Sequence, residues 1–356
     1  MSILPRHSCP NPLRTRLLAL LLALPALSMT QAATAATFCV NSEATAQAAL
    51  TTAATNGQAD IIRFRSGTIT LTQGLVFSTA GVGADHLALT LTGGFNADCT
   101  QRTGSTVLNG NNSVRVLDLQ LFGPQSLVVE HLTLLSGYSN FGGNLYVRLY
   151  NQGGGASLRI DNNAILLGSA QTASGALDIS GWGTLRIRNN LITGNSAPNY
   201  AVGSINLNGN NYLSNNTITG NSNTDGEGWV LYTNPTSTSS NLWLSNNILW
   251  DNDSYGDVYL FGQGTINLVH NNIGRHTNVP LGPASGGNLS VDPQFDSCGI
   301  FCFGKPLKSS SPLVDAGVNN PQGGLLVTDF DGNPRLMGPA VDIGAFELWR
   351  FGDGFE

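Results

Sequence analysis

The chain has 356 residues, 11% of them charged, and a formal net charge of −6 at pH 7. An average globular protein has about a quarter charged residues, so this chain is poor in charge. Lys305 and Lys308 are its only lysines, which argues against a nucleic-acid partner.

Glycine is abundant, with 43 residues. Low charge with many Gly, Asn, Ser and Thr residues also occurs in disordered chains, but disorder does not require apolar residues at a regular spacing. Here short apolar runs recur in phase. We therefore interpret the polar residues as turns between many buried strands.

The first 36 residues differ from the rest. Three arginines (Arg6, Arg14 and Arg16) precede the apolar run Leu17–Leu27, which is too short to cross a bilayer, and small residues follow at 32–36. This order is typical of a Sec signal peptide, so we predict that residues 1–36 are removed on export. The loss of three positive charges takes the formal charge from −6 to −9. We expect no transmembrane span in the mature chain.

Four of the five cysteines remain after this cleavage. An even number in an exported chain favours disulfide bonds. Cys298 and Cys302 are close enough in sequence for a local bridge, which leaves Cys39 to pair with Cys99. The spacing of the four matches no zinc pattern, so we expect no metal site from them.

A helix is predicted at the start of the mature chain. Residues 43–56 are rich in Ala and Thr, follow Ser42 as a candidate N-cap, and end at an Asn-Gly pair. We expect this helix to cover the first coil of a repeat array, because such arrays need polar caps. Strand-like runs separated by Gly or Asn follow at 61–64, 69–71, 87–92, 106–108 and 114–119.

A repeat becomes plain from residue 127 onward. Each copy has a short apolar strand, an Asn-Asn pair and a second apolar strand. The second Asn falls at 163, 190, 216, 247 and 272. The residue two positions before the first Asn is apolar in every copy: Ile160, Ile187, Leu213, Leu244 and Val269. A third strand precedes each copy, at 147–150, 176–180, 204–208, 230–232 and 258–261.

Three short strands per unit of roughly 25 residues, with no helix between them, favour a solenoid over a sandwich or a βαβ fold. Stacked coils place each strand about 4.8 Å from its counterpart, so every ladder is parallel and apolar side chains stack inside. We expect about nine coils, which at this spacing form a rod on the order of 45 Å long. The corner Asn tolerates a left-handed backbone, and equivalent Asn amides can bond along the stack. We interpret the Asn pairs as structural.

The coil pattern resembles the right-handed parallel β-helix of the pectate-lyase-like superfamily. Residues 38–40, 56–62 and 91–99 resemble the N-terminal part of secreted bacterial β-helix proteins of unassigned activity. Three later segments (311–317, 328–335 and 341–347) resemble the choice-of-anchor Q domain, which closes β-helices on exported proteins. The final Phe351–Glu356 resembles C-terminal tails of exported Gram-negative proteins and is a candidate sorting signal.

These resemblances imply an all-β chain made of a single-stranded right-handed parallel β-helix with an N-terminal capping helix. The expected segments are a signal peptide at 1–36, the β-helix with its cap at 37–290, a closing region at 291–348 and a short tail at 349–356. The implied location is outside the cell or on the cell surface of a Gram-negative bacterium.

Enzymes of this fold bind polysaccharide along an outer sheet face, so the outward columns are the place to look for a site. If Ile160 and its equivalents point inward, their neighbours point outward. One column then contains Arg159, Arg186, Tyr212, Trp243 and Leu268, and the other contains Asp161, Arg188, Ser214, Ser245 and His270.

Such a strip offers guanidinium groups for carboxylates and aromatic faces for sugar rings. We therefore predict that Arg159, Asp161, Arg186, Arg188, Tyr212 and Trp243 bind an extended, anionic glycan. The alternative is an ordinary solvated sheet face on which Arg159, Asp161 and Arg188 pair among themselves.

Catalytic residues are not assigned by the sequence. A lyase needs a carboxylate cluster for calcium and a basic residue, and Asp161 and Asp178 with Arg186 or Arg188 come nearest. A hydrolase needs two spaced carboxylates, and the clustered acids (Asp251, Asp253 and Asp257) lie in a turn-like loop. The Asp-His segment of pectate lyases and the His-Gly and Arg-Ile-Lys signatures of polygalacturonases are missing.

No cofactor is expected. Residues 329–333 offer a weak calcium-loop pattern that is better explained as a closing turn, because Ala340 stands where an EF-hand has its last acidic ligand. The leading hypothesis is an exported, monomeric, non-enzymatic surface or extracellular module that binds glycan. The second hypothesis is a polysaccharide lyase or glycoside hydrolase of the same superfamily.

Overall fold

The computed structural model describes residues 35–296 and 305–348, and the strands between Ala36 and Ile273 form an all-β parallel β-helix of about eight turns. The expected fold class is therefore confirmed, with about one turn fewer than expected. The predicted signal peptide and the C-terminal tail lie outside the described residues, apart from Ala35 and Ala36. The same is true of Cys298 and Cys302.

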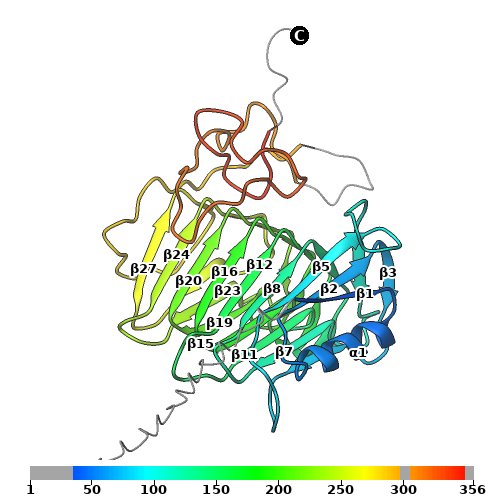
Figure 1. The fold of residues 1–356 in the computed structure, drawn as a ribbon. Helices are drawn as coiled ribbons and strands as arrows, with labels where there is room; N and C mark the ends of the chain where they lie inside the picture. The colour runs from blue at the N-terminus through cyan, green and yellow to red at the C-terminus, as the bar shows by residue number, and fades with distance from the viewer. Residues whose placement is uncertain (1–34, 297–304, 349–356) are drawn as a thin grey trace, which may run out of the picture. The chain divides into compact units, whose positions relative to one another are not determined.

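Three long parallel sheets run along the stack, and Figure 1 shows the strands of sheet A side by side in the order in which they pair. Sheet A comprises β1 (Ala36–Val40), β2 (Asp60–Arg65), β5 (Leu89–Phe95), β8 (Ser126–Glu130), β12 (Ser157–Asp161), β16 (Thr184–Arg188), β20 (Asn210–Ser214), β24 (Asn241–Ser245) and β27 (Thr265–Val269). Sheet B comprises β3 (Gly67–Thr70), β6 (Thr106–Asn109), β9 (Leu132–Leu135), β13 (Ala164–Leu166), β17 (Leu191–Thr193), β21 (Thr217–Thr219), β25 (Ile248–Trp250) and β28 (Asn272–Ile273).

Sheet C comprises β4 (Leu75–Ser78), β7 (Leu117–Leu121), β11 (Leu145–Leu149), β15 (Leu177–Trp182), β19 (Gly203–Asn208), β23 (Trp229–Pro235) and β26 (Gly256–Leu260). A short fourth sheet, sheet D, comprises β10 (Tyr138–Phe141), β14 (Ser169–Ala173), β18 (Ser196–Ala197) and β22 (Ser222–Asn223). Three strands per turn were expected, whereas sheet D was not. Its strands β18 and β22 have two residues each, too short to show an alternating pattern.

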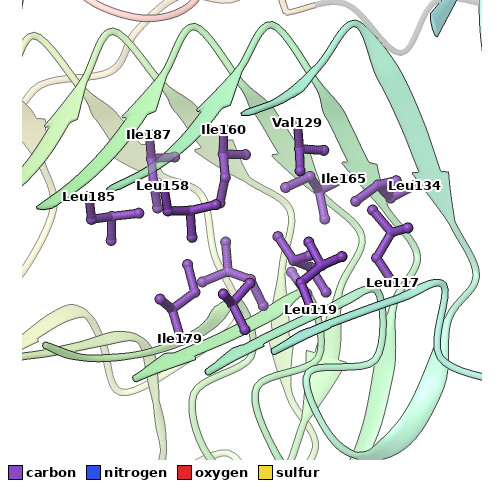
Figure 2. Packing of buried hydrophobic residues seen from close by; sticks show 14 of the residues in the cluster. Leu117, Leu119, Val129, Leu134, Leu158, Ile160, Ile165, Ile179, Leu185 and Ile187 are labelled. Atoms are coloured by element: carbon purple, nitrogen blue, oxygen red, sulfur yellow. The ribbon is translucent and has the colours of Figure 1, made fainter. Parts of the chain in front are cut away.

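The core is formed by apolar residues that alternate with outward residues along each strand. Val129, Ile160 and Ile187 occupy equivalent positions in consecutive turns and are buried. Figure 2 shows them beside Leu158 and Leu185, facing Leu119 and Ile179 of sheet C across the interior. The same inward positions recur in consecutive turns, so the repeat in the sequence becomes one continuous core.

The Asn pairs form the corner between sheets A and B. The first Asn of each of the first four pairs, such as Asn189, has a positive φ. The second Asn is buried, and its side chain continues the stack: Asn190 donates from its backbone and its amide to Asn216 Oδ1, both at 3.0 Å. The predicted structural role of the pairs is thus confirmed.

The last copy of this ladder is shifted by one residue from our expectation. Asn247 donates to Asn271 Oδ1 at 3.0 Å, so Asn271 rather than Asn272 continues the ladder. His270 consequently takes the corner position with positive φ, as His131 does in the turn that lacks an Asn pair.

The predicted helix is α1 (Glu43–Ala53), three residues shorter than expected at its C-terminal end. Ser42 is its N-cap, as predicted, and exchanges hydrogen bonds with Thr45. The helix ends early because the Asn56 side chain bonds Gln58 and Asp60 in a turn of its own. Its length rules out a membrane crossing, and the described part of the chain contains no helix that could make one.

Two features hold the N-terminal turns together. The predicted disulfide Cys39–Cys99 is formed and joins residues that are 60 apart in sequence. The Glu43 carboxylate accepts hydrogen bonds from the backbone of Thr72, Gln73 and Gly74. Burial acts to raise the pKa of Glu43, but these hydrogen bonds outweigh it and lower the pKa.

The segment 305–348, hereafter the closing region, contains no regular strand and packs on the outside of the β-helix. Leu313 and Ile343 cover Ile248 of sheet B, and Phe346 covers Leu191. Its own centre is the fully buried Arg335, which donates to two backbone carbonyls and lies 3.2 Å from the Glu347 carboxylate.

Candidate functional site

The six residues predicted to bind glycan lie on the outward face of sheet A. Pairing places Arg159, Arg186, Tyr212 and Trp243 in one column, as predicted. The column continues with Asn267 and not Leu268, whose side chain is buried in the core.

The second column also holds until its last member. Asp161, Arg188, Ser214 and Ser245 are paired in order, and the next residue is Val269 instead of His270. Both corrections have one cause. The final copy is displaced by one residue at the Asn ladder, and in a strand this exchanges the two faces.

Asp161 is the centre of an ion-pair network in the second column. It is 1% exposed, and its carboxylate accepts two hydrogen bonds from the Arg188 guanidinium, at 3.0 and 2.7 Å. Arg159 donates to the same carboxylate at 3.0 and 2.8 Å. This is the internal pairing that the sequence left open as the alternative, and it leaves neither Asp161 nor Arg188 directed at solvent.

The closing region covers part of the same face. The Gly323 carbonyl accepts hydrogen bonds from Arg186 and Arg188 at 3.2 and 3.3 Å. Gly323 also lies so close to Tyr212 that a methyl group added to it would meet the tyrosine Cβ at 2.4 Å. Arg159 and Trp243, at the two ends of the column, remain partly exposed.

The corner residues bind the closing region in a regular way. Asn189 donates to the Thr328 carbonyl at 2.6 Å, Asn246 to the Val318 carbonyl at 2.9 Å, and the His270 ring is 2.8 Å from the Ala316 carbonyl. The amides of successive turns therefore act as a row of anchoring points for the main chain of the closing region.

The outward face of sheet C carries a cluster of aromatic rings that sequence reasoning did not identify. Tyr232 lies 4.9 Å from Tyr200, 5.6 Å from Tyr259 and 6.3 Å from Phe261, measured between ring centroids. Trp229 packs edge-on against Tyr259 at 5.4 Å. A sixth ring, Tyr255, extends the cluster from Trp229 at 5.5 Å.

Part of this cluster faces solvent. Tyr255 is 50% exposed and Phe261 is 53% exposed, whereas the other four rings are partly buried. Arg275 lies over the Tyr255 ring at 3.9 Å. Burial raises the pKa of the Tyr232 hydroxyl, and the neighbouring tyrosines add to this effect. The rings therefore form an apolar platform edged by hydroxyl groups.

Charged pairs continue the face of sheet C towards the N-terminal turns. Arg148 pairs with Asp178 at 2.7 Å, and Arg115 pairs with Asp118. The Tyr146 ring lies between the two guanidinium groups, 3.8 Å from Arg148 and 4.3 Å from Arg115. Each pair retains part of its exposure, so this half of the face is polar and accessible.

The sequence contains a pattern that indicates the aromatic surface of sheet C. The third strand of each copy was predicted, and Tyr232 and Phe261 stand at its ends. Tyr200, Trp229 and Tyr255 lie outside the expected strands. Trp229 is the first residue of β23, whereas Tyr200 and Tyr255 reach the cluster from the turns before β19 and β26. Counting the aromatic residues in and beside the predicted third strand of each copy would have located this surface.

The carboxylates considered for catalysis do not converge. Asp161 belongs to sheet A and Asp178 to sheet C. Asp257 is buried and bonds to Asn252 and the backbone of Arg275, while Asp251 and Asp253 are exposed in the adjoining loop. Among residues 35–296 and 305–348, no group of three or more His, Cys, Asp or Glu side chains could hold a metal ion.

The candidate calcium loop is a structural turn. Asp329 is buried, and its carboxylate accepts hydrogen bonds from the backbone of Asn333 and Glu347.

Searches of protein-family models, curated proteins and solved structures found no match to this chain.

Proposed function

We propose that this chain is an exported bacterial β-helix protein that acts as a non-enzymatic surface or extracellular module and binds glycan through the outward face of sheet C. The aromatic cluster around Tyr232 carries the proposal. Six rings on the outside of one sheet are costly to leave beside water unless they serve as a contact surface.

The chemistry of the cluster suits a sugar chain. Tyrosine and tryptophan rings offer flat apolar faces together with hydroxyl and indole N–H groups at their edges. Sugar rings present the matching combination of C–H faces and hydroxyl groups. Rigid aromatic side chains also lose little conformational entropy on binding, so the platform is already arranged for a ligand.

The direction of the stack favours an extended ligand. Equivalent positions of neighbouring turns are about 4.8 Å apart, and Tyr232 and Tyr259 occupy paired positions of consecutive strands. A linear polymer that follows the stack therefore passes from the aromatic cluster to the Tyr146 region. There the surface becomes polar, with the ion pairs Arg148–Asp178 and Arg115–Asp118 beside the Tyr146 ring.

Export rests on the N-terminal signal pattern and on the disulfide between Cys39 and Cys99, since such bonds form in oxidising compartments. Cell-surface retention rests on the resemblance of the closing region and the tail to anchoring segments. N-terminal sequencing of the secreted protein and cell fractionation test both points. Retention of residues 1–36 in a cytoplasmic protein would refute export.

Binding is tested by titrating the purified mature protein with a panel of acidic and neutral polysaccharides. Tyr232→Ala with Phe261→Ala is expected to lower the affinity at least tenfold, which corresponds to about 1.4 kcal/mol. Arg186→Ala with Trp243→Ala serves as the matched double variant on sheet A and is expected to change the affinity less than twofold.

The opposite ranking of these two variants would move the site to sheet A, and the absence of binding by the unmodified protein would refute the proposal. The same incubations, with and without calcium, should release neither new reducing ends nor unsaturated uronates. Either product would instead establish a hydrolase or a lyase.

A further inference from the structure

A groove of about 450 Å³ lies on the outward face of sheet B, beside the closing region. Its floor is formed by apolar residues of consecutive turns, among them Val107, Leu135 and Leu166, and Phe330 and Asp331 of the closing region border it. Outward residues of a solvated sheet face are normally polar. An apolar floor indicates that something packs against it.

The groove continues an interface that the chain has already built. Further along sheet B the equivalent outward residues are covered by the closing region: Leu191 by Phe346 and Ile248 by Ile343. Leu191 also lines the groove. The covered surface and the open groove are therefore neighbouring parts of one apolar face.

The row of corner anchors extends in the same direction. Asn189, Asn246 and His270 bind carbonyl groups of the closing region, and the preceding corner residue is Asn162. Asn162 makes no side-chain hydrogen bond to any described residue, and its Oδ1 is buried without a partner. A buried amide oxygen of this kind destabilises the fold unless a donor reaches it.

We propose that the C-terminal tail, residues 349–356, docks in this groove. The tail begins beside the groove. The Glu347 backbone donates to the Asp329 carboxylate and the Phe330 backbone donates to the Ala345 carbonyl. The residues just before the tail are therefore next to Phe330 and Asp331, which border the groove. Eight extended residues reach about 26 Å. The groove crosses four strands, which span about 14 Å, so the tail is long enough to fill it.

The composition of the tail complements the groove. It contains Trp349, Phe351 and Phe355 for the apolar floor, and Arg350 for the border. Asp331 makes no ion pair within the part of the chain that the structure describes. Desolvation, and then the charge of Asp329, raise the pKa of Asp331, so a cation beside it would be favoured.

The test places a photo-crosslinking residue in the tail of the purified mature chain that retains residues 349–356. Phe351→p-benzoylphenylalanine is irradiated at low protein concentration, and the crosslinked peptides are mapped by mass spectrometry. Crosslinks within one chain to the strands that carry Leu135 and Leu166 are expected. The same residue at Val82, which is fully exposed, is the control and should not reach the groove.

Two further variants decide whether the groove itself is responsible. Leu135→Glu is expected to reduce the crosslink at least fivefold, while Val76→Glu, at an exposed apolar position of sheet C, should leave it unchanged. Arg350→Glu should weaken the crosslink, and Asp331→Arg added to it should restore the yield. Thermal melting confirms that each variant is folded.

Three results would overturn the proposal: crosslinks scattered over the surface, crosslinks found only between two chains, or a yield that Leu135→Glu does not change. Crosslinks between chains would show that a second copy occupies the groove instead. The glycan titrations on sheet C are independent of this result, because the groove and the aromatic cluster lie on different sheets.

Discussion

The outward faces of sheets A and C both carry arginine and aromatic residues, but they differ in how far these side chains are exposed to solvent. On sheet A the Arg188 side chain is 10% exposed and Asp161 is 1% exposed, because ion pairs and Gly323 enclose them. On sheet C, Tyr255 and Phe261 are about half exposed. Arginine and aromatic residues in an outward column therefore do not identify a binding site until their partners are known.

The two faces differ in exposure because they differ in what they contact. Sheet A and the corner beside it bind the closing region of the same chain, so Arg186, Arg188 and Asn189 already have partners there. The ring contacts of Tyr255 and Phe261 are with their neighbours in the cluster and, for Tyr255, with Arg275, and about half of each residue stays exposed. A satisfied face stabilises the fold, whereas an open face is available to a ligand.

The largest expected effect is a difference in stability between a variant that breaks an ion pair on sheet A and one that breaks an ion pair on sheet C. Asp161→Asn leaves the buried Arg188 without its charge partner and should lower the free energy of unfolding by about 3–5 kcal/mol. Asp118→Asn, which breaks a more exposed pair on sheet C, should cost about 1 kcal/mol. Urea unfolding of both variants measures the difference. Equal losses would contradict the contrast between a closed and an open face.

The next prediction tests the contact between the closing region and sheet A. Gly323 and Gly332 have nearly the same φ, +91° and +90°, but only Gly323 has Tyr212 beside it. Gly332→Ala should therefore cost only the backbone strain, about 1–2 kcal/mol. Gly323→Ala should cost roughly twice as much and speed the cleavage of the closing region by protease. Similar melting temperatures for the two variants would show that the contact is loose.

A pH effect is expected in the closing region. Burial, joined by the charges of Asp342 and Asp329, raises the pKa of Glu347 to about 8, although Arg335 acts against this. One guanidinium cannot neutralise three carboxylates, so the folded form holds a proton that the unfolded form releases above its ordinary pKa of 4.5. Stability is therefore fully present below pH 4.5 and is lost as the pH rises through 8.

This effect is measured by limited proteolysis of the closing region at pH 6 and pH 9, with cleavage expected to be at least fivefold faster at pH 9, a lower bound of about 1 kcal/mol. Glu347→Gln should remove most of the pH dependence. Tyr232→Ala, on the open face, should not alter it. A pH dependence that survives in Glu347→Gln would assign the proton to another group.

The smallest expected effect belongs to the open face. Tyr255→Ala and Arg275→Ala each remove the exposed contact between this ring and guanidinium, which is worth about 0.5–1 kcal/mol. The double variant should cost no more than the larger single one, because the two residues share the contact. A loss above about 2 kcal/mol for Tyr255→Ala would show that the aromatic cluster supports the fold.

Several features of the protein were predictable because they depend on neighbours along the chain or on a repeated pattern. The alternation around Ile160 and Ile187 predicted the inward face, and Ser42 predicted the start of the helix. The pairing of Cys39 with Cys99 followed from counting the cysteines. The Asn pairs predicted the corner and its ladder, because a left-handed corner and a stacked amide are properties of the residue itself.

Other features were decided only when distant segments came together. The one-residue shift at Asn271 was not visible locally, since two adjacent asparagines fit the pattern equally well. The burial of Arg188 depends on Gly323, and the cluster around Tyr232 depends on residues from three different coils, among them Tyr200 and Tyr255 from the turns before β19 and β26. Periodic backbone geometry repeats in the sequence, whereas the packing of an irregular closing region and the meeting of turn residues do not. The sequence therefore specified the solenoid, and tertiary contacts decided which of its faces stayed open.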